Sequence, residues 1–144
     1  MNNKLKSKTR LAAIQLVSQH LINNQDIENI KDDFDKYYRN TKLDKSPEKI
    51  EYNINFLSKL VNYYEKINII NIYQEINDLI IFDRKFEKWD TINKAIVLVA
   101  ISELKHSKNI KYKIILNDYL EISKLFVNLQ DIKIINSFLD KFIK

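Results

Sequence analysis

The sequence predicts an all-α fold, and three observations support this prediction. No segment alternates apolar and polar residues with a period of two, apolar residues recur every three or four positions, and the β-branched residues fall on these helical stripes. We expect about seven helices with short connections, packed as two sub-bundles (helices one to three and four to seven). With 144 residues, 45% of them hydrophobic, residues 1–144 can form one domain with its own core.

Three helices are predicted in the first half of the chain, over residues 8–23, over residues 26–40 and from residue 46 onward. The third starts at Ser46-Pro47-Glu48. There the serine can accept a hydrogen bond from an unpaired amide, the proline has the φ of a first turn, and the glutamate complements the positive end of the helix dipole. The apolar stripes of these helices are Leu11, Ile14, Val17 and Leu21; Ile27, Ile30, Phe34 and Tyr37 or Tyr38; and Ile50, Ile54, Leu57, Val61 and Tyr64.

Four further helices are predicted in the second half. The fourth covers residues 69–80, and residues 82–88 form a connection. Asp90 or Thr91 can cap the fifth helix, in which residues 95–101 are apolar on every side, so this helix should lie at the centre of the domain. The sixth and seventh helices, over residues 113–126 and 131–143, are amphipathic.

The chain contains no glycine and no cysteine. Phosphate-binding loops, dinucleotide-binding turns and nucleophile elbows need glycine for positive φ or close backbone approach, so these classes of enzyme site are excluded. Disulfides and thiolate zinc sites are excluded by the lack of cysteine. Asparagine is the usual substitute at a left-handed helix end. Six asparagines fall near expected ends: Asn23, Asn24, Asn40, Asn68, Asn109 and Asn128.

Catalytic and metal-binding patterns are also missing. His20 and His106 have no second ligand at a metal-like spacing, and Asp32-Asp33 lies on a charged helix face. Glu103 stands in an apolar helix and must reach either a buried partner or solvent, and both readings stay open. We therefore expect that the protein is not an enzyme and that it binds neither a metal ion nor a cofactor. Without a long apolar run or a signal sequence, the protein is expected in the cytoplasm.

The strongest electrostatic feature is a basic N-terminal segment with Lys4, Lys6, Lys8 and Arg10. These cations precede the first acidic residue, Asp26, in a chain of formal charge +5. Because basic groups at a helix N-terminus oppose the helix dipole, an anionic partner such as RNA would explain them. A solubilising tail is the alternative, and an arm folded away against the protein's own acidic side chains would overturn the RNA-binding interpretation.

The last third of the chain carries three ordered motifs, KAIVLVAISEL at 94–104, IKYKIILNDYLEISK at 110–124 and KIINSFLDK at 133–141. They resemble signatures of the NusB family of transcription antitermination factors, which run K/R-A-x-L-R-x-A-x-Y-E-L, then I-P-Y-K-V-x-I-N-E-x-x-E-L-A-K, then K-F-V-N-G-V-L-D. The correspondence extends from about Trp89 to Lys141. Asn117 and Asn136 match family positions too, and we expect these mid-helix amides to hydrogen-bond between helices.

The resemblance implies the same two-sub-bundle fold and a role in RNA binding. NusB proteins hold the boxA element of nascent RNA with a basic N-terminal segment, and similar basic residues here precede Ala13-Ile14-Gln15. The family's Y-K pair at the start of the sixth helix is matched as well. The RNA-binding residues that we expect on this basis are Lys4, Lys6, Lys8, Arg10, Gln15, Tyr112 and Lys113.

The resemblance also implies a protein partner, the ribosomal small-subunit protein NusE, within the RNA polymerase antitermination complex. Its docking surface on the C-terminal helices carries over to Asn93 and Ile134. Some relatives form homodimers, so a homodimer is a further expectation. Two alternatives remain: a helical protein-interaction module that has lost RNA binding, and a NusB-like accessory domain of an rRNA methyltransferase system.

Overall fold

The computed structural model describes residues 1–42, 49–79 and 85–143, and within these ranges the chain forms seven α-helices and no β-strand. The all-α prediction is confirmed. No helix in this part of the chain is long and apolar enough to cross a membrane. The helices are α1 (Asn3–Asn23), α2 (Ile27–Asp33), α3 (Ile54–Lys66), α4 (Ile69–Leu79), α5 (Thr91–Lys105), α6 (Tyr112–Ser123) and α7 (Leu129–Phe142).

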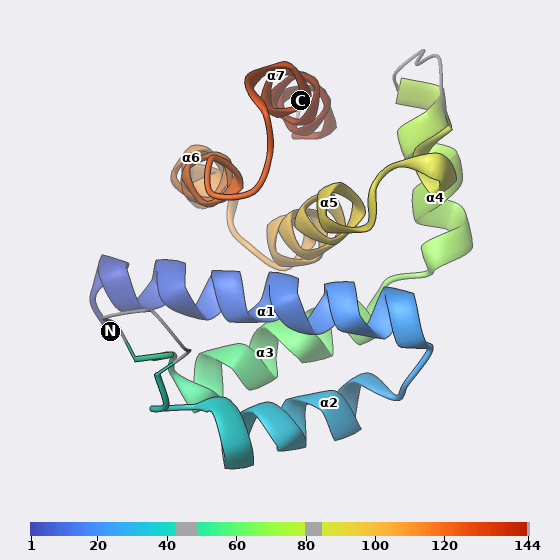
Figure 1. Ribbon diagram of the computed structural model, residues 1–144. Coiled ribbons are helices and arrows are strands. Elements are labelled where there is room, and N and C mark those ends of the chain that lie inside the picture. Colours follow the sequence, from blue (N-terminus) through green and yellow to red (C-terminus); the bar gives the residue numbers. More distant parts are fainter. Residues whose placement is uncertain (43–48, 80–84, 144) are drawn as a thin grey trace.

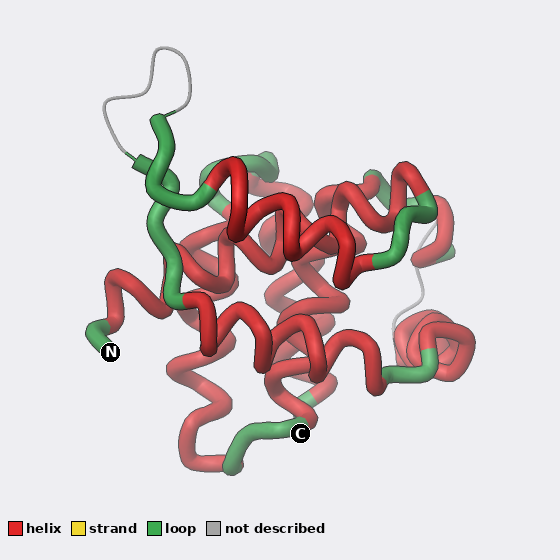
Figure 2. Tube along the Cα trace, turned by 90° about the horizontal axis from the view of Figure 1, so that it is seen from below, coloured by secondary structure: helices red, strands yellow, loops and turns green. Residues whose placement is uncertain are grey.

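The helices form two groups that meet along α1 and α5. In Figure 1, α2 and α3 lie on one side of α1, whereas α5, α6 and α7 lie on the other side and α4 stands at the edge. The view from below looks along the direction in which these helices are stacked, and it draws the described chain as helices joined by loops without a strand (Figure 2). Helix α1 packs mainly against α5 and α3 and also contacts α2 and α6. A single cluster of buried apolar side chains takes members from every α-helix, so the two groups share one core.

Helix α5 is the centre of that core. Every residue from Ala95 to Leu104 is buried, as the apolar run predicts. Neighbouring helices and the 3₁₀ turn Phe86–Lys88 contribute large side chains with almost no exposure, among them Phe86, Tyr119 and Phe138. A helix buried on all sides has little room for a polar side chain, which makes Glu103 near its end a residue that must be paired.

Helix α1 begins at Asn3, five residues earlier than predicted. Asn2 caps it by accepting a hydrogen bond from the Leu5 backbone N–H at 2.7 Å. The apolar periodicity starts only after this point, and so the pattern did not mark the first turns. Lys4 and Lys6 therefore lie on a helix rather than on a flexible tail.

Asparagine shapes both ends of the helices in this glycine-free chain. Asn24 and Asn40 adopt positive φ, 55° and 64°, as expected for substitutes of glycine. Asn53, Asn68 and Asn128 instead cap the beginnings of α3, α4 and α7, accepting hydrogen bonds from backbone N–H groups three residues later. The polar side chains thus mark where helices start as well as where they stop.

Helix α3 begins at Ile54, later than predicted. The start signal at Ser46-Pro47-Glu48 lies outside the described residues. Ile50, expected within the helix, instead pairs with the preceding segment, donating to the Thr41 carbonyl and accepting from the Asn40 N–H, both at 2.7 Å. This backbone pairing is not that of a helix, and α3 starts only after the Asn53 cap.

The remaining differences are at helix ends and at two amides. Helix α2 gives way to a π-helical turn, Phe34–Tyr38, within the segment predicted as one helix. Helix α6 ends at Ser123, three residues before its predicted end. Asn117 and Asn136 are exposed, so they do not act as the buried interhelical amides that we expected.

An acidic contact joins the start of α2 to the end of α3. A hydrogen bond to Glu28, then partial burial and the negative charge of Glu28, raise the pKa of Glu65 to about 7. The folded protein therefore binds more protons than the unfolded chain at pH values between the ordinary pKa of glutamate and about 7. Within this window the contact makes stability fall as pH rises.

We predict that Glu65→Gln reduces this fall in stability, because glutamine keeps a hydrogen-bonding side chain and removes the titrating carboxylate. Urea unfolding at pH values near the two ends of this window measures how much the free energy of unfolding changes with pH. Glu121→Gln is the control, since Glu121 is exposed and pairs with Lys124 within one turn. If the free energy of unfolding depends on pH equally in wild type and in Glu65→Gln, the contact between Glu65 and Glu28 does not cause this dependence.

Candidate nucleic-acid interface

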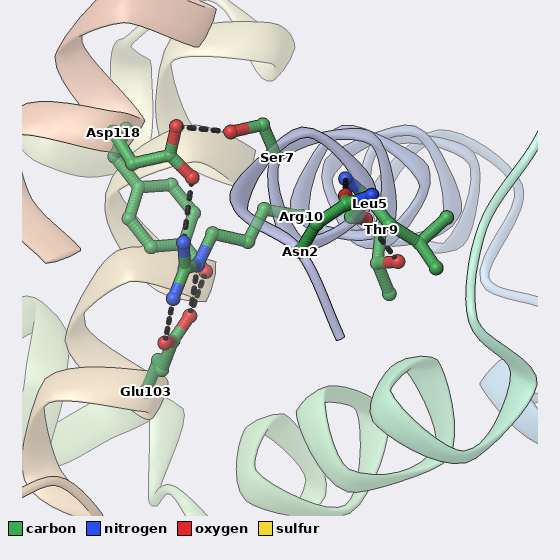
Figure 3. Close-up of polar contacts among 8 residues, drawn as sticks. Asn2, Leu5, Ser7, Thr9, Arg10, Glu103 and Asp118 are labelled. Carbon is green, nitrogen blue, oxygen red and sulfur yellow. Dashed lines mark hydrogen bonds and ion pairs between the residues drawn. The ribbon is translucent and has the colours of Figure 1, made fainter.

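Arg10 on α1 is buried and binds two carboxylates from other helices (Figure 3). Its Nε and Nη2 donate to Oε1 and Oε2 of Glu103 on α5 at 2.8 and 2.7 Å. Its Nη1 donates to Oδ2 of Asp118 on α6 at 2.6 Å. Each of the three guanidinium nitrogens thus donates to a carboxylate oxygen, and the contacts tie three helices together.

Other side chains complete the network around Arg10. The Tyr119 hydroxyl donates to Glu103 Oε1 at 2.7 Å, and the Ser7 hydroxyl donates to Asp118 Oδ1. The guanidinium carbon also lies 5.5 Å from the ring centre of Phe56 and 5.7 Å from that of Tyr119. A buried ion pair is stable only when its remaining donors and acceptors are satisfied, and here these contacts satisfy them.

Arg10 and Tyr119 keep their protons over the physiological pH range, because the pKa of each is raised. Burial alone would lower the pKa of Arg10, but the hydrogen bond to Glu103 and its negative charge outweigh burial and raise the pKa above its usual value. Burial and the charge of Glu103 raise the pKa of Tyr119 well above its usual value. Both groups stay protonated, so Arg10 remains a cation bound to Glu103 and Asp118.

These contacts change the role expected for Arg10. Its side chain is 7% exposed and faces the protein's own carboxylates, whereas the sequence suggested an RNA contact. Its position gave a signal of burial, because Arg10 shares a face of α1 with Ile14 and Val17, which are four and seven residues later. Asp118 was not identified from the sequence, because nothing local marks it as the partner of a residue on α1.

The other basic side chains of α1 differ in exposure and in ion pairing. Lys8 is partly exposed, and its Nζ lies 3.4 Å from Oε2 of the exposed Glu51. Two of the four cations thus pair with the protein's own carboxylates, as expected if RNA binding were absent. In the described part of the chain, neither Lys4, which is exposed, nor the half-exposed Lys6 forms an ion pair.

The first turns of α1 form a positive helix end, and we call Lys4, Lys6 and Lys8 the basic turn. No acidic residue occurs in the first turn of α1, so the lysine charges add to the positive end of the dipole. Lys4, Lys8 and Gln15 are spaced by four and seven residues, which places them on one stripe of α1. Gln15 is exposed on that stripe.

Tyr112 and Lys113 lie at the start of α6, the helix that Arg10 and Ser7 contact. Tyr112 is half-buried and Lys113 is exposed. Asp118 follows Tyr112 by six residues, a rise of about 9 Å along the helix axis. Helix α1 therefore contacts α6, the helix that carries Tyr112 and Lys113, although α1 and these two residues are about a hundred residues apart in sequence.

The residues predicted to bind a protein partner lie where α5 and α7 begin. Asn93 is buried, and its Nδ2 donates to Asp131 Oδ2 at 3.3 Å, so its amide is engaged within the protein. Ile134 is half-buried on α7. Large apolar side chains are exposed in the nearby α6–α7 connection and at the start of α7: Leu125, Phe126 and Leu129.

Both histidines contact neighbouring rings and backbone carbonyl oxygens. No group of three or more potential metal-binding side chains gathers in the portions that the structure describes. The His106 ring stacks on Tyr63 with ring centres 4.3 Å apart, and its Nδ1 lies 2.8 Å from the Ser102 carbonyl oxygen. His20 contacts the Gln25 carbonyl oxygen and the Tyr64 ring. Both histidines serve local packing.

We predict that Glu103→Ala destabilises the protein by about 3–5 kcal/mol, because it leaves the Arg10 charge buried with only part of its partners. Replacing both residues, as in Arg10→Met with Glu103→Leu, should cost much less than the sum of the single changes. Urea unfolding followed by circular dichroism measures these differences.

Glu121→Ala serves as the control for the Glu103 variant, since it removes an exposed pair with Lys124 that contributes at most about 1 kcal/mol. A Glu103→Ala protein as stable as this control would show that the Arg10 pair does not hold the helices together.

Comparison with known proteins agrees with this architecture. The NusB family matches residues 7–144. The transcription antitermination protein NusB of Rickettsia bellii (strain OSU 85-389) is 33% identical over 144 residues, covering 97% of this chain and 92% of the relative. That of Rickettsia massiliae is 29% identical, covering 99% and 95%. That of Shewanella denitrificans is 33% identical over 88 residues, covering 58% and 66%. The chain belongs to the NusB family.

Proposed function

We propose that this protein is a transcription antitermination factor that binds boxA-like RNA together with the ribosomal small-subunit protein NusE. The observation that carries the proposal is the basic turn of α1, where Lys4 and Lys6 form no ion pair in the described structure. Membership of the NusB family supports the same assignment.

RNA binding follows from the placement of charge and rings. Lys4, Lys6 and Lys8 attract phosphates, with Lys8 leaving its weak, exposed pair with Glu51. Gln15 on the same stripe offers an amide to a base edge. Tyr112 and Lys113 on α6 supply a ring and a cation to an unstacked nucleotide.

Arg10 contributes by holding the basic turn in position. It fixes the first turns of α1 against α5 and α6, so the lysines one or two turns earlier are presented on a rigid helix rather than on a mobile tail. A preorganised site loses less conformational entropy on binding. The protein then works by binding alone, in the cytoplasm with the RNA polymerase complex, without catalysis and without a cofactor.

The corner between α5 and α7 is the surface that we assign to NusE. Ile134 contributes an apolar contact there, and the exposed Phe126 and Leu129 extend this apolar surface. Asn93 is buried and contributes indirectly, because its hydrogen bond to Asp131 holds the beginning of α7 in position. A partner bound here enlarges a weak RNA interface into a specific one by holding two binding surfaces together.

A helical interaction module without RNA binding is the second candidate. It is favoured by the pairing of Lys8 and Arg10 with Glu51, Glu103 and Asp118, which removes positive charge from the N-terminal segment. Such a module would bind its protein partner equally well with and without RNA.

We predict that Lys4→Ala with Lys6→Ala weakens binding of a boxA-like RNA and reduces its salt dependence. Each lost phosphate contact lowers the slope of log K against log salt by about 0.7, so the double variant should lose about 1.4. Filter binding or anisotropy at several salt concentrations gives both quantities. Arg10 is left unchanged, since its loss would disturb the fold.

Lys66→Ala with Lys88→Ala is the matched control, because it removes the same charge from two exposed lysines on other elements. A scrambled RNA tests sequence preference. If the two double variants bind boxA-like RNA with the same affinity and salt slope, the basic turn is not the RNA site and the second candidate is favoured.

We predict that Leu129→Lys lowers the affinity for NusE roughly tenfold or more, because a charge replaces an exposed apolar side chain of the proposed surface. Ile70→Lys on α4 is the control, since Ile70 is 75% exposed and Leu129 is 73% exposed. Calorimetric titration with NusE measures both. Equal affinities would place the partner elsewhere.

A further inference from the structure

A groove of about 370 Å³ opens where the end of α5, the start of α6 and the end of α7 meet. This volume is within the usual range of small-molecule sites. Two aromatic side chains, an amide, a lysine and two aliphatic side chains line it: Tyr112, Phe142, Asn109, Lys105, Leu104 and Ile143. Tyr112 and Phe142 are half-buried, whereas Asn109 and Lys105 at the rim are exposed.

The chain around this groove is strongly cationic. From Lys105 to Asn117 it contains four lysines and one histidine and no acidic residue. Lys105, Lys108, Lys111 and Lys113 are all exposed. One of them has an acidic partner, because Lys105 Nζ lies 3.7 Å from Oε2 of the partly exposed Glu75 on α4. The segment is thus a concentrated positive surface beside an aromatic groove.

We propose that this groove binds one unstacked nucleotide of a single-stranded RNA, with the base in the groove and the neighbouring phosphates on the lysines of residues 105–113. The inference rests on the RNA binding proposed above and specifies the subsite of the nucleotide assigned there to Tyr112, namely this groove with Asn109, Phe142 and Lys105. Tyr112 offers a ring for stacking, and the Asn109 amide offers a donor and an acceptor to a base edge.

The position of Lys105 suits this occupant. Its Nζ lies 5.6 Å from the ring centre of Phe142, so a cation already sits at the mouth of the groove. A phosphate beside the bound base would meet this cation, and its weak pair with Glu75 can be exchanged at small cost.

An RNA fits better than an acidic peptide, because the groove combines planar rings and an amide with cations on its rim. A peptide carboxylate would use the cations alone. Tyr112 in the groove and Asp118, the residue that binds Arg10 of α1, both belong to α6 with an axial rise of about 9 Å between them, so the groove and the contact with α1 share one helix.

Two groove variants of the full-length protein test the inference by binding to a boxA-like RNA. Tyr112→Leu keeps an apolar side chain and removes the stacking ring, and Lys108→Ala with Lys111→Ala removes two exposed charges from the rim. Stacking on an aromatic side chain contributes roughly five- to 150-fold in affinity, so Tyr112→Leu should bind at least about fivefold more weakly. Lys66→Ala with Lys88→Ala is again the control for the double lysine variant.

Photocrosslinking identifies the bound nucleotide directly. RNA carrying 4-thiouridine at successive positions should label the segment around Tyr112 or the end of α7 from one position, and Tyr112→Leu should reduce that label. Thermal unfolding and circular dichroism confirm that the variants are folded, and the lysine variant provides an independent measurement if Tyr112→Leu is not.

The outcomes separate this inference from the proposed function. If wild type binds RNA through Lys4 and Lys6 but both groove variants bind as tightly as the control and no label reaches the groove, the base-binding subsite is refuted and RNA binding stands. If wild type binds no RNA, both the proposed RNA-binding function and the base-binding subsite are refuted. If a poly-glutamate peptide shifts the NMR signals of the groove while the RNA does not, the groove serves an acidic protein partner and the inference is overturned.

Discussion

The ion pair between Arg10 and two carboxylates is the interaction on which the rest of this structure depends. It places a charge in the interior, where only full pairing makes it tolerable, and its two acidic partners come from α5 and α6. Apolar packing between α1 and α5 is non-directional and could accommodate a shift along the helix. The bidentate contact with Glu103 fixes the register, because a displacement of one turn would leave both charges buried and unpaired.

This register decides what the surface presents. With Arg10 and Ser7 held against α6, the earlier turns of α1 carry Lys4 and Lys6 on a helix whose dipole is also positive at that end. The proposed RNA site is thus a consequence of burial: one basic residue of the segment is used to anchor the helix, and the others are displayed by it. The same helix, α6, carries the aromatic groove at its start, so the two proposed RNA contacts share one rigid support.

Much of the fold could be predicted from the sequence, and the site only in part. Helical periodicity identifies the α-helices, and the uniform apolarity of residues 95–101 identifies the central one. The start of α1 was missed because its first turns lack an apolar stripe, and the start of α3 because Ile50 pairs with the backbone of Asn40 and Thr41. Lys4 and Lys6 have the exposure expected of RNA contacts, whereas Arg10 and Asn93 are engaged inside the protein.

Periodicity and composition are local properties of the chain, and they were enough to predict the helical class, the central helix, the lack of glycine-dependent sites and the basic character of the N-terminal segment. Only the packing of the helices shows that Arg10 reaches Glu103 and Asp118, that Glu103 has a partner rather than solvent, and that Leu104, Tyr112 and Phe142 line one groove. Each of these is a contact between residues far apart in sequence. Local patterns do not specify such contacts, since the partner of a buried charge is chosen by the packing of whole helices.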